Sequence, residues 1–311
     1  MYNFPETEYV HTNGIKMAVH QAGEGRPIVL CHGWPEMAYS WRHQIQPLVD
    51  AGYHVITPDQ RGYTTTDQPE AVEDYDIHHL SADLTGLLDH YGYDNALFVG
   101  HDWGAIILWN LAMLHPTRVA GLIQMSVPFM ERGKTEWVGF WESMLGPDFY
   151  IVHFNQQPGV AAKAFESNTR NFLNNLYRTD QWLEKPKDYG PGMPFINMAS
   201  DTSPTGRPLL SEAELDVFVR GFETCGFHKP INWYRNFTRN WETMADVRQQ
   251  IDQPALMIYG KHDMVPPSTN LVSFVPNVKE VTLDCGHWVQ QEKPEETTTL
   301  MLGWLKTHYP A

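Results

Sequence analysis

The sequence predicts an α/β fold in which a mainly parallel sheet is interrupted by a helical insertion. Short β-rich runs bounded by turn residues alternate with longer helical patterns up to about residue 128. Between residues 129 and 247 the strand-like runs vanish, and Trp, Phe, Tyr, Met, Pro and Asn become dense. Strand-like runs return after residue 248. We therefore assign residues 1–128 and 248–311 to one core domain and residues 129–247 to a helical domain inserted into it.

The individual elements follow from local patterns. Asn13-Gly14 supplies the positive φ angles of a tight turn, so the runs on either side of it are predicted to form an opening hairpin. Ser81 is a good N-cap for a helix with leucines at helical spacing. The expected strands are 8–12, 16–20, 27–31, 54–58, 96–100, 121–126, 255–259 and 278–283, and the expected helices of the core are 81–91 and 294–306.

Composition excludes several classes of function. The 311 residues include 22 Lys and Arg against 37 Asp and Glu, which gives a formal net charge of −15. Nucleic acids and anionic membranes attract basic faces, so neither is expected as a partner, whereas small neutral molecules are compatible. The three cysteines are scattered and form no C-x-x-C motif, so neither a disulfide framework nor a zinc site is predicted. No cofactor or other metal is expected. A reducing cytoplasm fits this cysteine usage, and neither a secretory signal nor a membrane span is apparent.

One segment has the pattern of a nucleophile elbow. An apolar strand runs into Gly100-His101-Asp102-Trp103-Gly104 and then into an apolar helix. In such a turn the flanking glycines avoid clashes, and the central side chain is exposed at the start of the helix. That central residue is Asp102, for which helix capping is the plainer interpretation. The sequence context favours a nucleophile.

A nucleophile of this kind needs a base and a group that orients the base. Asp263 follows one late strand, and His287 follows the last one. The chain order of nucleophile, acid and histidine is the order expected for this type of fold. His262 and Asp284 are near neighbours of these positions, and we interpret both as structural.

The loop His32-Gly33-Trp34-Pro35-Glu36 follows an early strand of the predicted sheet. The backbone amides of Trp34 and Trp103 are our prediction for an oxyanion hole, and Trp34-Pro35 is a candidate for a cis bond. A plain turn is the alternative interpretation of this loop. Glu36 either orders a hydrolytic water or is a solvated turn residue, and the sequence leaves this open.

Five motifs together resemble the epoxide hydrolases of the α/β-hydrolase fold. They are HGWPE at 32–36, DQRGY at 59–63, GHDWGA at 100–105, NWYRN at 232–236 and CGHW at 285–288. The likeness spans nearly the whole chain. It departs from the family pattern at Thr64-Thr65-Thr66, where the family usually has glycine followed by Ser or Thr, and this affects only the expected conformation of a loop.

The resemblance implies that the insertion is a cap whose tyrosines act above the nucleophile. Tyr234 matches the position within NWYRN, and Tyr150 precedes a stretch similar to Y-x-x-x-F-Q-x-P-G with one extra residue before Pro158. In the implied reaction Asp102 opens an epoxide to form a hydroxyalkyl ester, and His287, oriented by Asp263, activates the water that hydrolyses it. Trp34, Trp103 and the two tyrosines are the expected substrate-binding residues.

Two other functions remain open on the sequence. A haloalkane dehalogenase would use the same Asp102 and His287, with the Trp103 indole N–H on the leaving halide, but it has no need of two tyrosine hydroxyls. A non-catalytic ligand-binding protein of this fold is the other, although every position of the triad holds a competent residue. The expected partners are an epoxide and water. A homodimer is compatible with the sequence, which identifies no interface, and the sequence does not specify the preferred epoxide.

Overall fold

We describe the chain from a computed structural model that covers residues 4–183 and 195–311. The described chain separates into two compact units, which we treat one at a time. The first unit comprises residues 1–61, 78–131 and 247–311, and the second comprises 62–77 and 132–246. Residues 62–77 group with the inserted segment, although the sequence pattern places them in the core domain.

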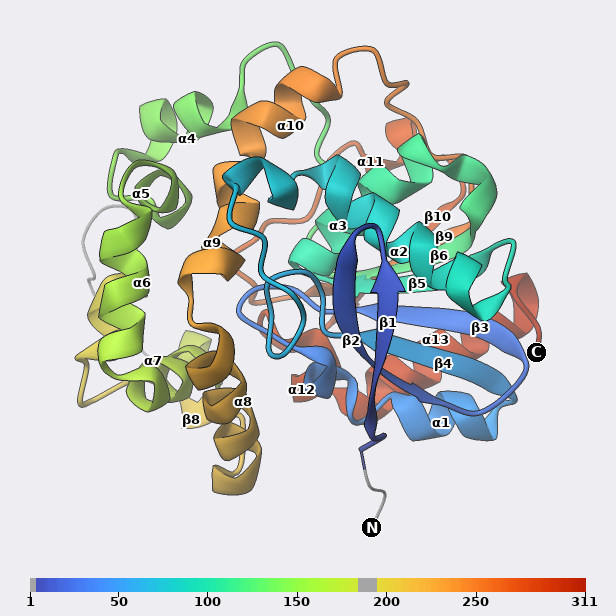
Figure 1. Cartoon of the computed structure of the whole chain (residues 1–311), viewed down its shortest axis with the longest axis horizontal. Coiled ribbons are helices and arrows are strands. Elements are labelled where there is room, and N and C mark those ends of the chain that lie inside the picture. Colours follow the sequence, from blue (N-terminus) through green and yellow to red (C-terminus); the bar gives the residue numbers. More distant parts are fainter. Residues whose placement is uncertain (1–3, 184–194) are drawn as a thin grey trace. The chain divides into compact units, whose positions relative to one another are not determined.

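The first unit is built on an eight-stranded sheet with the order β1-β2-β4-β3-β5-β6-β9-β10 (Figure 1). Its strands are β1 (Thr7–Thr12), β2 (Ile15–Ala22), β3 (Arg26–Cys31), β4 (Tyr53–Pro58), β5 (Ala96–His101), β6 (Val119–Met125), β9 (Ala255–Gly260) and β10 (Val278–Leu283). β1 and β2 form the predicted hairpin, and β2 pairs antiparallel with β4. All pairs from β4 to β10 are parallel, which confirms the predicted mainly parallel sheet.

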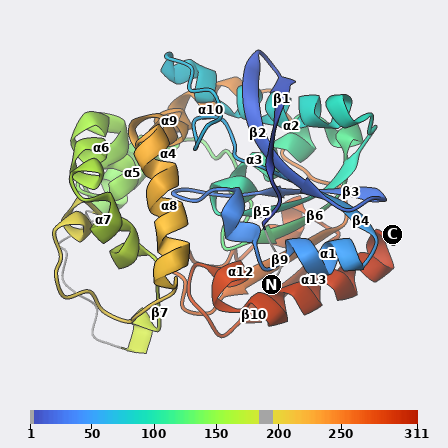
Figure 2. The same ribbon diagram turned by 60° about the horizontal axis from the view of Figure 1, so that its bottom comes forward.

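Helices cover both faces of this sheet. α1 and α13 lie on one face, and α2 and α3 lie on the other, as both ribbon views show (Figures 1 and 2). The helices of this unit are α1 (Ile45–Asp50), α2 (Ile77–Tyr91), α3 (Trp103–Leu114), α11 (Leu271–Phe274), α12 (Val289–Glu292) and α13 (Pro294–His308). Two covered faces explain why β4, β5 and β9 are buried along their whole length.

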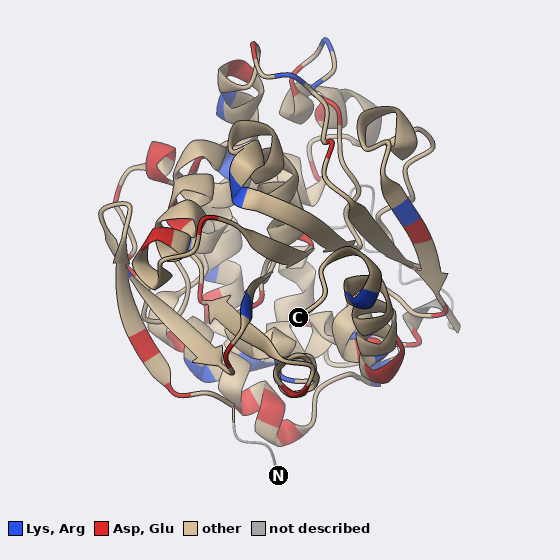
Figure 3. Ribbon diagram, turned by 90° about the vertical axis from the view of Figure 1, so that its right-hand side faces the viewer, with Lys and Arg blue, Asp and Glu red and all other residues tan. Residues whose placement is uncertain are grey.

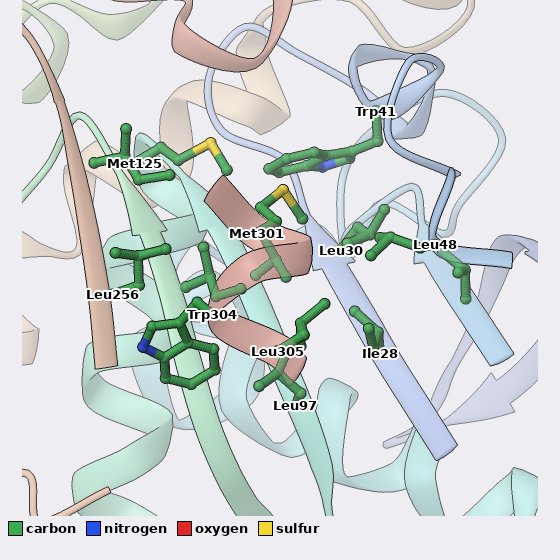
Figure 4. Close-up of a cluster of buried hydrophobic side chains, with 14 of the residues drawn as sticks. Ile28, Leu30, Trp41, Leu48, Leu97, Met125, Leu256, Met301, Trp304 and Leu305 are labelled. Atoms are coloured by element: carbon green, nitrogen blue, oxygen red, sulfur yellow. The ribbon is translucent and has the colours of Figure 1, made fainter. Parts of the chain in front are cut away.

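A hydrophobic core lies on the face of the sheet that α1 and α13 cover (Figure 4). Met301, Trp304 and Leu305 of α13 pack against buried side chains of the strands, among them Leu97 and Leu256. These residues lose nearly all contact with water, and burial of apolar surface is the main stabilising term in folding. The core therefore gives the loops at the strand ends a rigid base.

The predicted start of α2 is wrong. The helix begins at Ile77 and not at Ser81, whose buried side chain lies within it. The Ile77 amide donates to the Asn240 side chain at 2.9 Å. The hydrogen-bond acceptor for this amide of the first turn is thus distant in sequence, so a local search for a capping residue could not find it.

The second unit is mainly helical. It contains α4 (Trp137–Leu145), α5 (Tyr150–Gln156), α6 (Pro158–Ser167), α7 (Thr169–Leu176), α8 (Glu212–Cys225), α9 (His228–Arg235) and α10 (Phe237–Thr243) (Figure 2). The prediction of no strands here needs one correction, because β7 (Arg178–Thr179) and β8 (Arg207–Pro208) form a small antiparallel pair. The predicted insertion also includes residues 184–194, which lie outside the described residues.

Candidate active site

The segment after β5 forms the predicted sharp turn. Asp102 has φ 53° and ψ −119°, and α3 begins at the next residue. A Cβ at Gly104 would lie 2.1 Å from the carbonyl oxygen of Cys31, so no larger residue fits there without movement. Residues other than glycine rarely adopt a positive φ angle, and such backbone strain is typical of functional turns.

The two carboxylate oxygens of Asp102 have different surroundings. Oδ1 accepts a hydrogen bond from the Trp34 backbone amide at 2.7 Å. Oδ2 lies 3.6 Å from Nε2 of His287. A Cβ at Gly33 would be 2.4 Å from Cβ of Asp102, so glycine allows the loop that carries Trp34, with its cis Trp34-Pro35 bond, to approach this closely. One oxygen is therefore held by the backbone, and the other faces the histidine.

His287 is oriented from its other side by Asp263. Its Nδ1 donates to both oxygens of Asp263, each at 2.9 Å. Burial alone would lower the pKa of His287, but the carboxylates of Asp263 and Asp102 outweigh burial and raise it well above the ordinary value. Conversely, burial would raise the pKa of Asp263, and the charge and hydrogen bond of His287 lower it. The carboxyl ends of β5, β9 and β10 thus bring the three predicted residues together.

The two predicted tyrosines lie close to one another in the second unit. Tyr150 begins α5, and Tyr234 lies in α9. Their ring centroids are 5.8 Å apart at 77°, an edge-to-face arrangement. Phe154 packs against both rings, at 5.7 Å from Tyr150 and 5.2 Å from Tyr234. The extra residue before Pro158 therefore does not separate Tyr150 from Tyr234.

Comparisons with known proteins agree with this geometry. The family model for the α/β-hydrolase fold matches residues 26–294. Epoxide hydrolase A of Mycobacterium tuberculosis is 42% identical, with 97% of each chain covered, and epoxide hydrolase 2 of Siraitia grosvenorii is 35% identical over 96% of this chain and 97% of its own. The crystal structure of epoxide hydrolase A from Mycobacterium thermoresistibile matches with a TM-score of 0.88 at 38% identity, over 99% of this chain and 100% of that one.

The chain belongs to the epoxide hydrolases of the α/β-hydrolase fold. The expectation drawn from the five motifs is confirmed for the family and the fold.

Glu36 of this epoxide hydrolase is buried, so the interpretation as a solvated turn residue is wrong. Its carboxylate accepts from the Gly33 amide at 2.8 Å and from Gln290 Nε2 at 2.9 Å, and it contacts Nδ1 of His101 at 2.6 Å. Burial would raise the pKa of Glu36, but the interaction with His101 outweighs it and lowers the pKa to about 2. The ionised Glu36 thus connects the loop of Trp34 to the strand that carries Asp102.

His101 was part of the elbow motif, but the sequence analysis gave it no role. Its Nε2 lies 2.8 Å from the carbonyl oxygen of His287, while its Nδ1 faces Glu36. A backbone carbonyl can only accept a hydrogen bond, so Nε2 is the donor to His287. The ring therefore bridges Glu36 to the backbone of His287. Its position beside the nucleophile was the only signal in the sequence.

His262 and Asp284 contact one another. Nε2 of His262 lies 2.9 Å from Oδ1 of Asp284, and the Lys261 ammonium lies 3.3 Å from the same oxygen. Hydrogen bonds from His262 and Lys261 lower the pKa of Asp284. This agrees with our interpretation of both residues as structural.

Over residues 4–183 and 195–311, no cluster of three or more His, Cys, Asp or Glu side chains is arranged to hold a metal ion. Within the same residues, no helix has the length and apolar character needed to cross a bilayer.

Proposed function

We propose that the chain hydrolyses small-molecule epoxides to vicinal diols through an ester on Asp102. The observation that carries the proposal is the asymmetric environment of the Asp102 carboxylate. Trp34 holds Oδ1 at 2.7 Å, whereas Oδ2 faces His287. A carboxylate suits attack on saturated carbon, because the ester that forms can be hydrolysed to restore it.

In the first step Oδ2 of Asp102 attacks one carbon of the epoxide. The new C–O bond forms as the bond from that carbon to the ring oxygen breaks, and its electron pair stays on the oxygen. We propose that Tyr150 and Tyr234 hydrogen-bond to this oxygen and that one of them protonates it. The cap, which we assign to residues 129–247, would have to present these hydroxyls to Asp102. The rings of the two tyrosines are close enough for both hydroxyls to serve one oxygen.

In the second step neutral His287 removes a proton from water, and the hydroxide formed attacks Cγ of Asp102. Negative charge develops on Oδ1, which already accepts from the Trp34 amide, and we assign the second donor to the Trp103 amide. Collapse of this intermediate breaks the bond from Cγ to the ester oxygen, and the protonated histidine supplies the proton that leaves with the diol. The proton left on the Asp102 carboxyl group restores the tyrosine that was deprotonated in the first step, so both residues return to their starting forms.

Ester formation itself prepares His287 for this role. The charges of Asp263 and Asp102 both raise the pKa of His287 in the free protein. Esterification neutralises Asp102, so we expect the pKa of His287 to fall and a larger fraction of the ring to become neutral. The same carboxylate would thus act first as nucleophile and then, by losing its charge, release the base.

The decisive experiment traps the ester. We expect His287→Gln, mixed with styrene oxide, to gain the mass of the whole epoxide, because the first step proceeds without the base. Intact-protein mass spectrometry measures the gain, and Asp102→Asn is the control that should show none. A gain of only the alkyl group from 1-bromobutane would instead indicate dehalogenation. Reversible retention of unchanged epoxide with no adduct would indicate a binding protein.

Trp34, Trp103, Tyr150 and Tyr234 are the proposed contacts of the bound epoxide. A cytoplasmic location and a homodimer remain predictions from the sequence. Light scattering coupled to size-exclusion chromatography measures the mass in solution. It would distinguish a monomer of 311 residues from a homodimer.

A further inference from the structure

The backbone around His287 is held by side chains that the proposed reaction does not use. The carbonyl oxygen of His287 accepts a hydrogen bond from the Ser126 hydroxyl at 2.6 Å, in addition to the bond from His101. Ser126 is distant in sequence and directly follows β6. A single carbonyl that receives two buried side-chain donors is firmly placed.

Ser126 adopts an unfavourable backbone conformation to make this bond. Its φ is +67°, in the region that favours glycine. Its own amide donates to the Ile258 carbonyl on β9 at 3.0 Å, so the strained residue is anchored on the neighbouring strand. A serine in this conformation points to a use for its hydroxyl, because glycine would meet the backbone requirement without strain.

Glu292 holds the backbone on both sides of His287. One of its carboxylate oxygens accepts from the Gly286 amide and the other from the Trp288 amide, each at 3.1 Å. Glu292 ends the short helix α12, which begins two residues after His287. The approach of this loop to β9 is also tight, since a Cβ at Gly260 would lie 1.9 Å from the Gly286 carbonyl oxygen.

We propose that Ser126 and Glu292 are positioning residues that fix the backbone of His287 for hydrolysis of the ester. This rests on the proposed function, in which His287 acts only in the second step. Ser126 holds the carbonyl of His287, and Glu292 holds the amides of its two neighbours. The imidazole then has few ways to move except rotation of its own side chain, which Asp263 restricts through Nδ1. Small displacements of a catalytic group reduce rates steeply.

Two substitutions of Ser126 separate positioning from stability. Ser126→Ala and Ser126→Gly both remove the hydroxyl, but only glycine relieves the strain at φ +67°, so we expect the glycine variant to melt at a higher temperature than the alanine variant. We nevertheless expect both to hydrolyse the ester about tenfold more slowly than the wild type, with formation of the ester changed by less than about twofold. Stopped-flow tryptophan fluorescence with styrene oxide gives the two rates.

Glu292→Gln tests the other contact. Glutamine keeps the shape of the side chain but can accept from only one of the two amides, because its NH₂ group is a donor. We expect the ester to accumulate during turnover, as seen by intact-protein mass. Glu296→Gln is the matched control, because the Glu296 carboxylate is half-exposed and contacts Lys293 instead.

The inference fails if the Ser126 and Glu292 variants hydrolyse the ester at the wild-type rate. It also fails if the rates follow stability, so that Ser126→Gly behaves like the wild type while Ser126→Ala is slow. These outcomes differ from failure of the proposed function, in which His287→Gln would form no ester in the first place.

Discussion

At the scale of single residues, two features determine which reaction the fold supports: the residue type at the turn after β5 and the pair of tyrosines. An aspartate occupies the turn after β5, which gives a nucleophile for saturated carbon in place of the serine of an esterase. The paired tyrosines supply weakly acidic hydroxyls that can protonate an alkoxide without a strong acid. Both features were visible in the sequence, but the distance between the tyrosine rings was not.

The tyrosines should affect only the first step. We expect Tyr234→Phe to slow ester formation about 100-fold, because one proton donor is lost while the ring and its packing against Phe154 remain. Tyr150→Phe should act in the same direction, and the double variant should be slower than either. Stopped-flow fluorescence with styrene oxide measures the rate. Tyr177→Phe, in the same unit, should leave it unchanged, and an unaffected Tyr234→Phe would contradict the assignment.

Glu36 should make stability depend on pH in acid. Its folded pKa of about 2 lies below the ordinary 4.5, so its contribution is present above pH 4.5 and is lost as the pH falls toward 2. This difference corresponds to about 3 kcal/mol. We expect the free energy of unfolding in urea to fall less between pH 5 and pH 3 in Glu36→Gln than in the wild type. Parallel curves would show that the pKa of Glu36 is the same in the folded and unfolded protein, which contradicts the lowered value.

At the scale of elements, close approach between β3 and α3 positions the nucleophile. The approach depends on Gly104, the second residue of α3. The same edge of the sheet receives the loop after β3 and the late loops of Asp263 and His287, because parallel strands end there together. The elbow, the proposed oxyanion donor and the proposed base thus all lie in loops at the same end of the sheet.

A pair of glycine substitutions tests this approach. We expect Gly104→Ala to lower the free energy of unfolding by about 1–3 kcal/mol, because the added Cβ would lie 2.1 Å from the Cys31 carbonyl oxygen. Gly303→Ala is the control within α13, where no heavy atom lies within 4 Å of the added Cβ, and alanine should stabilise this helix by up to about 1 kcal/mol. Urea unfolding measures both, and equal effects would refute the packing argument.

At the scale of the whole molecule, the net charge of −15 favours neutral substrates. Acidic residues occur on strands, helices and loops of the side shown in Figure 3, with fewer Lys and Arg among them. The electrostatic field of this negative charge repels anions over about a Debye length, and salt screens the field. The charge therefore acts on the rate of encounter and not on the bond-making steps.

This field should distinguish two classes of epoxide. We expect kcat/KM for styrene oxide to change little between about 10 and 300 mM NaCl, because a neutral molecule is not steered. For an epoxide that bears a carboxylate, kcat/KM should rise with salt as repulsion is screened. Steady-state rates at matched pH measure both dependences, and a fall with salt for the anion would reveal a local cationic site that overrides the net charge.

The sequence by itself determined the family and the sheet, and it predicted the residues of the triad. These signals depend only on local sequence or on the order of residues along the chain: the glycine spacing around Asp102, the apolar strand runs, and the order of Asp102, Asp263 and His287. In the structure Asp102 lies in a sharp turn, and His287 contacts both Asp102 and Asp263. The tertiary structure decided how those residues are supported. Asn240 at the start of α2, Glu36 beside His101, and Ser126 and Glu292 around His287 all act across long separations or through backbone atoms. Hydrogen bonds to main-chain groups leave no periodic pattern in the sequence, because any residue type supplies the same amide or carbonyl, so only the folded arrangement shows them.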